Sequence, residues 1–246
     1  MTDPFDNQIV LIFPPVSKPS EPPAGIAYIK QALQNNNISC GLVDANIEAL
    51  YSLLQYTYQP DSSRERAALR NVTDNLNALK SWKTYQNLSL YKRSVKELDR
   101  FLTMAGRKSG CRLRLKNLVY PDLTTVKSAD LRYAYEHPEI SPFYDYFEQL
   151  TDRAAAGSPG IIGISLMFLS QALSAFSLIG CLRRRKIKSK ILLGGGLLTS
   201  WMNASNRQLD FQDMVDACLP HRGDQALLDY LGVKYTSVCG LPDYSD

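Results

Sequence analysis

The sequence has few histidines and no clustered cysteines. Two histidines, His137 and His221, and five widely spaced cysteines occur in 246 residues. No CxxC or CxxxCxxC spacing is present, so the sequence signatures of iron–sulfur and structural zinc sites are absent. An odd number of scattered cysteines is typical of reduced, mostly buried thiols. Two histidines provide no histidine–carboxylate–nucleophile set, and we predict neither catalytic residues nor a metal site in this chain.

Long apolar runs and common nucleotide motifs are also missing. The longest apolar run, Gly160–Leu169, is too short to cross a membrane, and residues 1–8 are polar rather than typical of a signal peptide. Neither G-x-G-x-x-G nor a Gly-Lys-Ser/Thr P-loop occurs, so ordinary nicotinamide and nucleoside-triphosphate sites lack their signature. We therefore expect a cytoplasmic protein that binds no membrane.

Charge is unevenly distributed along the chain. The net charge is +4, but residues 60–116 contain 14 Lys/Arg and 5 Asp/Glu. A second basic run, Arg183–Lys190 (RRRKIKSK), ends an expected helix, where positive charge is favourable. Because interleaved aromatic residues and a known RNA-binding module are both missing, we expect no nucleic-acid binding.

Five short apolar segments are typical of buried strands in a parallel sheet, because they show little polar alternation. These strands are expected at Gln8–Phe13, Ile38–Val43, Gly160–Leu166, Lys190–Leu193 and Met214–Leu219. Helices are expected from Gly25 onward and over residues 171–183, 201–209 and 224–231. With right-handed crossovers, this order predicts an α/β fold with a doubly wound, Rossmann-like or flavodoxin-like sheet of about five parallel strands.

More than a hundred residues separate the second and third expected strands, which is too long for an ordinary connection. Amphipathic helices are expected here at residues 46–56, 63–82, 89–105, 128–136 and 142–155, and residues 117–126 are expected to be loop or a short extended piece. We predict a large helical insertion over residues 47–157. Residues 1–46 and 158–231 then form the two parts of the α/β domain, and residues 232–246 form a tail.

Ligands of open parallel sheets bind beyond the carboxyl ends of the strands. Small, polar or proline residues follow every expected strand: Pro14-Pro15, Asp44-Ala45-Asn46, Ser165-Leu166, Gly194-Gly195-Gly196, and His221-Arg222-Gly223-Asp224. Such residues let a backbone approach a ligand closely and donate N–H groups to it. Several of these residues also have a purely structural explanation. The glycines can form a tight turn, Ser165 can cap a helix, Asp44 can stabilise a turn, and His221 can be a solvated loop residue.

In this order, the strand ends resemble the N-terminal cobalamin-binding domain of cobalamin-dependent radical S-adenosylmethionine enzymes. The resemblance covers Ile9–Asp44 and Gly160–Leu231. Its motifs are Phe13-Pro14-Pro15, PAGIAYI at 23–29, VDAN at 43–46, IGISL at 162–166, ILLGGG at 191–196 and HRGDQALL at 221–228. His221-Arg222 stands where the family commonly has Gly-Glu. The Asp-x-His-x-x-Gly motif is absent, so histidine ligation of cobalt of that kind is not expected.

The resemblance implies a cobalamin-binding role for a specific set of residues. Ser165 and Gly194–Gly196 would lie along the nucleotide tail of the cofactor. The loop near the corrin would be shaped by Pro14, Pro15 and Gly25, and Asp44 and Asn46 would close the neighbouring strand end. Leu166 and Gly223 complete the expected cofactor-binding set.

The family also implies a parent protein that is larger than this chain. Its radical domain, with an iron–sulfur cluster and S-adenosylmethionine, is expected to follow Asp246, and that domain would be the main partner. The parent would be a methyltransferase or a related iron–sulfur oxidoreductase, whereas this chain would bind cobalamin without catalysing a reaction itself. The alternative is a non-catalytic α/β scaffold or sensor with a degenerate cofactor site that binds a protein partner. Neither the substrate nor the oligomeric state follows from the sequence.

Overall fold

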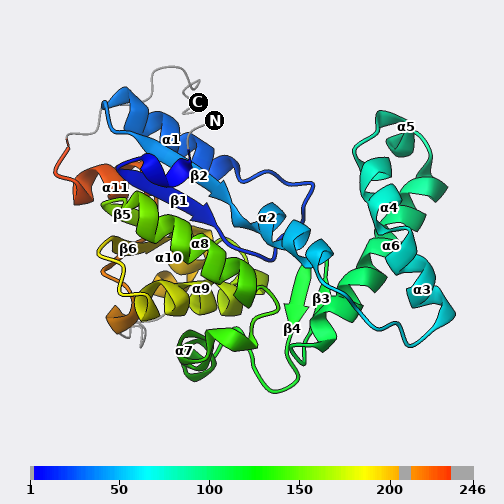
Figure 1. Ribbon diagram of the computed structural model, residues 1–246. Helices are drawn as coiled ribbons and strands as arrows, with labels where there is room; N and C mark the ends of the chain where they lie inside the picture. Colours follow the sequence, from blue (N-terminus) through cyan, green and yellow to red (C-terminus); the bar gives the residue numbers. More distant parts are fainter. Residues whose placement is uncertain (1–2, 205–211, 234–246) are drawn as a thin grey trace.

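The computed structural model describes residues 3–204 and 212–233, and its centre is a five-stranded parallel sheet, with helices on both of its faces (Figure 1). The strands are β1 (Ile9–Phe13), β2 (Cys40–Asp44), β5 (Ile161–Ser165), β6 (Lys190–Gly194) and β7 (Ala217–Leu219). Their order in the sheet is β2-β1-β5-β6-β7. This arrangement confirms the predicted doubly wound α/β fold, and the order reverses between β1 and β5, where ligands of such sheets bind.

Side-chain alternation along the strands divides the core into two layers. One face carries Ile9, Leu11 and Phe13 of β1 and is covered by helices α1 (Ala24–Asn35) and α11 (Gly223–Tyr230). The other face carries Val10 and Ile12 and belongs to the larger apolar cluster. That cluster includes side chains of α2 (Ala45–Ser52), α8 (Tyr144–Gly157), α9 (Ala172–Arg184) and α10 (Gly196–Ala204). Because both faces are buried, the strands are almost continuously apolar.

A helical lobe protrudes from one end of the α/β domain, on the right of Figure 1. It contains α3 (Ser63–Arg70), α4 (Val72–Leu79), α5 (Trp82–Tyr85), α6 (Leu88–Arg107) and the antiparallel hairpin of β3 (Arg112–Arg114) and β4 (Asn117–Val119). The single helix expected at 63–82 is thus divided, and Asn71 both ends α3 and begins α4. Asparagine favours such helix boundaries because its side chain competes for backbone hydrogen bonds.

The rest of the segment 47–157 packs on the α/β domain instead of forming part of the lobe. Helix α7 (Ser128–Glu136), the turn η3 (Pro138–Ile140) and α8 all contact α9. The approach of α7 is especially close, because a Cβ placed on Gly180 of α9 would lie 2.1 Å from the carbonyl oxygen of Tyr135. Residues 172–182 of α9 are all buried, as expected for a helix enclosed between the sheet and other helices.

The remaining element boundaries differ slightly from the sequence expectations. Short 3-10 helices lie at η1 (Pro4–Asp6), η2 (Leu53–Gln55), η4 (Leu169–Gln171) and η5 (Gln212–Met214). The helix expected at 201–209 begins earlier, at Gly196, and is described up to Ala204. Residues 205–211, most of the expected tail and Cys239 lie outside the described residues.

The basic run at the end of α9 takes part in ion pairs within the protein. Arg183 pairs with Asp216 at 2.8 Å, Arg184 pairs with Glu139 at 2.9 Å, and Arg185 pairs with Asp152. These contacts join α9 to neighbouring elements on the protein surface. Exposed pairs of this kind contribute little individually to stability. None of the helices within the described residues is long and apolar enough to span a membrane.

Candidate functional site

A hollow lies at the carboxyl ends of the central strands, on the face covered by α1 and α11. Its volume is about 570 Å³, within the range of roughly 300–1,000 Å³ that is usual for small-molecule sites. The strand residues lining it are Leu11, Gly163, Ile164, Ser165, Leu192, Gly194 and Leu219. The hollow therefore occupies the edge of the sheet where the fold predicts a ligand.

The hollow exists because small residues occupy neighbouring positions on one face of the sheet. Gly163 pairs with Leu11 on one side and Leu192 on the other, and the next row pairs Ser165 with Gly194. Gly163 and Ser165 thus stand on the same face of β5 as Ile161, which carries a large aliphatic side chain. A Cβ added to Gly163 would lie 2.8 Å from Leu11 Cδ2, so even one methyl group would crowd this row.

The turn after β6 is tightly packed against the turn after β5. Gly195 has φ +105°, and a Cβ there would lie 2.3 Å from the carbonyl oxygen of Leu166. The Leu166 N–H donates to the Gly194 carbonyl at 2.8 Å, and the Leu197 N–H donates to the Leu166 carbonyl at 3.1 Å. Glycine is required at position 195 because both its backbone conformation and this close approach exclude a side chain.

The opposite wall of the hollow comes from two helices and the loop before α11. Gly25, Tyr28 and Ile29 of α1 line it, and no atom lies within 4 Å of a Cβ added at Gly25. Gly223 and Leu227 line it from α11. The resemblance-based set is therefore partly assembled here, because Gly25, Ser165, Gly194, Gly195, Gly196 and Gly223 line one cavity.

The other residues of the expected set lie outside the lining of this hollow and hold neighbouring loops. The buried Asn46 side chain accepts a hydrogen bond from the Ser17 N–H at 2.8 Å. The Asp44 carboxylate caps α2 by accepting from the Ile47 N–H at 3.1 Å, and burial raises its pKa. Leu166 is fully buried and contributes its backbone to the turn. Pro14 and Pro15 are buried in the loop after β1.

Gln171 connects the loops after β1 and β5, a role that sequence reasoning missed. Its fully buried amide donates from Nε2 to the Pro14 carbonyl at 2.7 Å and accepts at Oε1 from the Met167 and Phe168 N–H groups, each at 2.9 Å. Ser170 adds a hydrogen bond from its hydroxyl to the Val16 carbonyl at 2.7 Å. The loop that contains Pro14 and Pro15 is thus held to the loop after β5 by a glutamine on η4.

The mouth of the hollow combines polar groups with an exposed apolar loop. His221 and Arg222 contribute to the lining, and Arg222 forms an ion pair at 3.0 Å with Asp224, which is 3% exposed. Beside them, Met167, Phe168 and Leu169 are 41%, 44% and 45% exposed. Contiguous exposed apolar side chains beside a cavity are typical of binding surfaces.

Thiols and metal-ligating groups are not gathered at this hollow in the part of the chain that the structure describes. Burial raises the pKa of Cys40 and of Cys111 to about 12, so both thiols are protonated near neutral pH. Among residues 3–204 and 212–233, no group of three or more His, Cys, Asp or Glu residues could hold a metal ion. Most of the residues that line the hollow are aliphatic or glycine, and such a lining suits a largely apolar group with few directed hydrogen bonds.

Comparison with protein-family models, curated proteins and solved structures finds no significant match to this chain.

Proposed function

We propose that this chain is the cobalamin-binding module of a larger radical S-adenosylmethionine enzyme, a methyltransferase or a related iron–sulfur oxidoreductase. The observation that supports this most strongly is the hollow made by Gly163, Ser165 and Gly194 at the carboxyl edge of the sheet. A side chain at either glycine would fill part of this space. A flat heteroaromatic group such as the benzimidazole of the cobalamin tail suits such a narrow, mostly apolar space.

The residues in the hollow and at its mouth would give each part of the cofactor a chemically suitable environment. Ser165 offers a hydroxyl, and the turn at Gly194–Gly196 would bring backbone close to the tail. The exposed side chains of Met167, Phe168 and Leu169 at the mouth suit the apolar face of a corrin. When bound, cobalamin would supply methyl transfer through its cobalt. The part of this chain would be to bind and orient the cofactor and to exclude water from it.

A titration of the purified chain with hydroxocobalamin tests this proposal. We expect saturable one-to-one binding with a Kd in the micromolar range, which corresponds to about −8 kcal/mol at 1 μM. We also expect a base-off visible spectrum, because a tail held in the hollow cannot keep its benzimidazole on cobalt. Cobinamide, which lacks the nucleotide tail, is the matched control and should bind at least about tenfold more weakly.

Two results of the titration would contradict the proposal. Equal affinities for hydroxocobalamin and cobinamide would show that the tail makes no contribution, and the hollow would then have another ligand. Absence of any spectral change or binding heat at high micromolar cofactor would favour the non-catalytic scaffold or sensor instead.

A further inference from the structure

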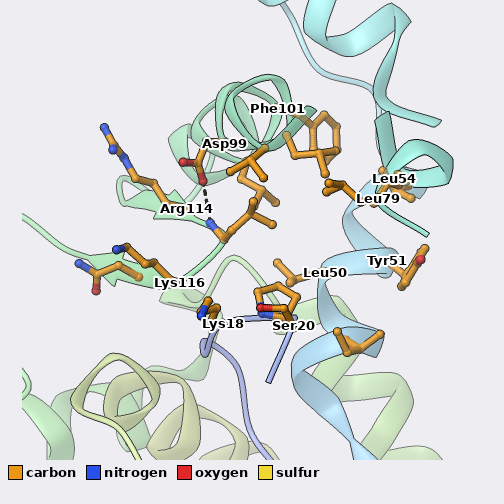
Figure 2. A pocket seen from close by; sticks show the side chains of 18 of the residues that line it. Lys18, Ser20, Leu50, Tyr51, Leu54, Leu79, Asp99, Phe101, Arg114 and Lys116 are labelled. Carbon is orange, nitrogen blue, oxygen red and sulfur yellow. Dashed lines mark hydrogen bonds between the residues drawn. The ribbon is translucent and has the colours of Figure 1, made fainter. Parts of the chain in front are cut away.

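A second and larger cavity lies between the helical lobe and the α/β domain, and it shares no lining residue with the first hollow. Its volume is about 690 Å³. The walls come from α2, from α4 and α6, from the β3–β4 hairpin and from the loop after β1 at residues 18–20 (Figure 2). It does not belong to the proposed cobalamin site, and the inference drawn from it stands independently of that proposal.

The lining of this cavity is mostly apolar, with aliphatic and aromatic side chains. Figure 2 shows Leu50, Leu54, Leu79 and Phe101 gathered on one side of it. The one carboxylate in the lining, Asp99, accepts a hydrogen bond at Oδ1 from the Leu115 N–H at 2.9 Å. Because several wall leucines are only partly buried, a bound apolar group would remove more apolar surface from water.

The β3–β4 hairpin places positive charge along one side of the cavity. Leu113 and Leu118 pair across the hairpin and are buried in the core, so strand alternation directs the flanking residues to the opposite face. Arg112 and Arg114 lie on that face and line the cavity. Lys116, in the turn between the two strands, also contributes to the lining.

Within residues 3–204 and 212–233, none of these three cations forms an ion pair, although the Asp99 carboxylate lines the same cavity. Among the described residues, no carboxylate lies within ion-pairing distance of Arg112, Arg114 or Lys116. Two other lining cations already have partners, since Lys18 pairs with Glu21 at 2.7 Å and Lys80 lies 5.1 Å above the Tyr51 ring. In Figure 2, Arg114 and Lys116 lie on the side opposite Leu54 and Leu79.

We infer that this cavity binds an amphipathic anion, a long acyl or alkyl chain that ends in a carboxylate or phosphate. The apolar wall at Leu50, Leu79 and Phe101 matches the chain, and the hairpin cations, which form no ion pair among the described residues, match the head group. A neutral lipid would leave these cations without a partner, and a cationic one would be repelled. Both a free fatty acid and an anionic membrane lipid have this chemistry.

Calorimetric titration of the full chain with a set of matched amphiphiles tests the inference. Dodecanoate, dodecyl phosphate, dodecanol and dodecyltrimethylammonium are compared below the concentrations at which they aggregate. We expect saturable binding of the two anions, with affinities at least about tenfold above those of the neutral and cationic compounds. Equal affinity for all four, or absence of binding by both anions, would overturn the inference.

Two variants separate the chain-binding wall from the charged side. Leu50→Trp fills the cavity and should weaken dodecanoate binding at least about tenfold, as should the double charge reversal Arg114→Glu/Lys116→Glu. The control is Lys83→Glu/Lys92→Glu, because these exposed cations lie on the same lobe but outside the cavity lining. Circular dichroism checks that each variant is folded. If Lys83→Glu/Lys92→Glu weakens dodecanoate binding as much as Arg114→Glu/Lys116→Glu does, the overall charge of the lobe and not the cavity governs binding, and the inference is wrong.

A sedimentation assay with vesicles distinguishes the two sources of the anion. Vesicles of phosphatidylcholine with phosphatidylglycerol are compared with vesicles of phosphatidylcholine alone. Co-sedimentation with the anionic vesicles that Leu50→Trp abolishes identifies a membrane lipid as the ligand. Dodecanoate binding in calorimetry without co-sedimentation identifies a free amphiphile. If Leu50→Trp retains both dodecanoate binding and co-sedimentation with anionic vesicles, the ligand is not held in this cavity, and the inference is contradicted.

Discussion

The Ser165→Phe variant is expected to lose at least about a hundredfold in affinity for hydroxocobalamin, close to 2.7 kcal/mol. Ser165 ends β5 and lies beside Gly194, facing the hollow between the sheet and helices α1 and α11. A phenyl ring there would occupy the space that the proposed nucleotide tail needs. Because the ring would enter an existing cavity, we expect the free energy of unfolding to stay unchanged or to rise by up to about 1 kcal/mol. Cofactor titration and denaturant unfolding measure the two effects.

The matched control for this substitution is Ser89→Phe, at an exposed position of α6 that lines neither cavity. It should bind hydroxocobalamin as the unmodified chain does. An unchanged affinity in Ser165→Phe, with the fold preserved, would mean that the cofactor binds elsewhere. A loss of stability above about 2 kcal/mol would mean that the hollow is smaller than the structure describes.

The Gly180→Val variant is expected to lower the free energy of unfolding by about 3 kcal/mol or more. A Cβ at Gly180 would meet the Tyr135 carbonyl oxygen at 2.1 Å, and a backbone atom cannot move aside without displacing α7 from α9. The larger helix propensity of valine offsets only a few tenths of a kcal/mol of this cost. Denaturant unfolding followed by circular dichroism measures the change.

Gly25→Val provides the comparison, because Gly25 also lies in a helix but a Cβ there meets no atom within 4 Å. Its stability should change by no more than about 0.5 kcal/mol. If Gly180→Val is as stable as Gly25→Val, then α7 does not pack closely on α9 at Gly180.

The central sheet was predictable because its strands are nearly continuous apolar runs between helical segments. Ile9–Phe13 and Ile161–Ser165 lie within the segments expected from the sequence. The β3–β4 hairpin was not predicted, because three residues such as Arg112–Arg114 are too few to show alternation. Nor does an amphipathic pattern identify the partner of a helix, so the packing of α7 and α8 on α9 could not be inferred.

The candidate site was predictable where residues follow strand ends and less so where the fold brings distant groups together. Ser165 and Gly194–Gly196 were found by position, whereas Gly163 was overlooked although it shares a strand face with Ser165. Gln171 lies 157 residues from Pro14, and a hydrogen bond across that separation leaves no periodic signal in the sequence. The second cavity likewise depends on how the lobe packs against α2.

Hydrogen exchange of the chain with and without saturating hydroxocobalamin tests the central claim most directly, because it locates the bound cofactor on the backbone. We expect slower exchange in the segments around Ser165–Phe168, Gly194–Gly196 and Gly223, with no change in α3–α6. Slower exchange confined to the helical lobe, or no change anywhere, would contradict a cobalamin site at the carboxyl edge of the sheet.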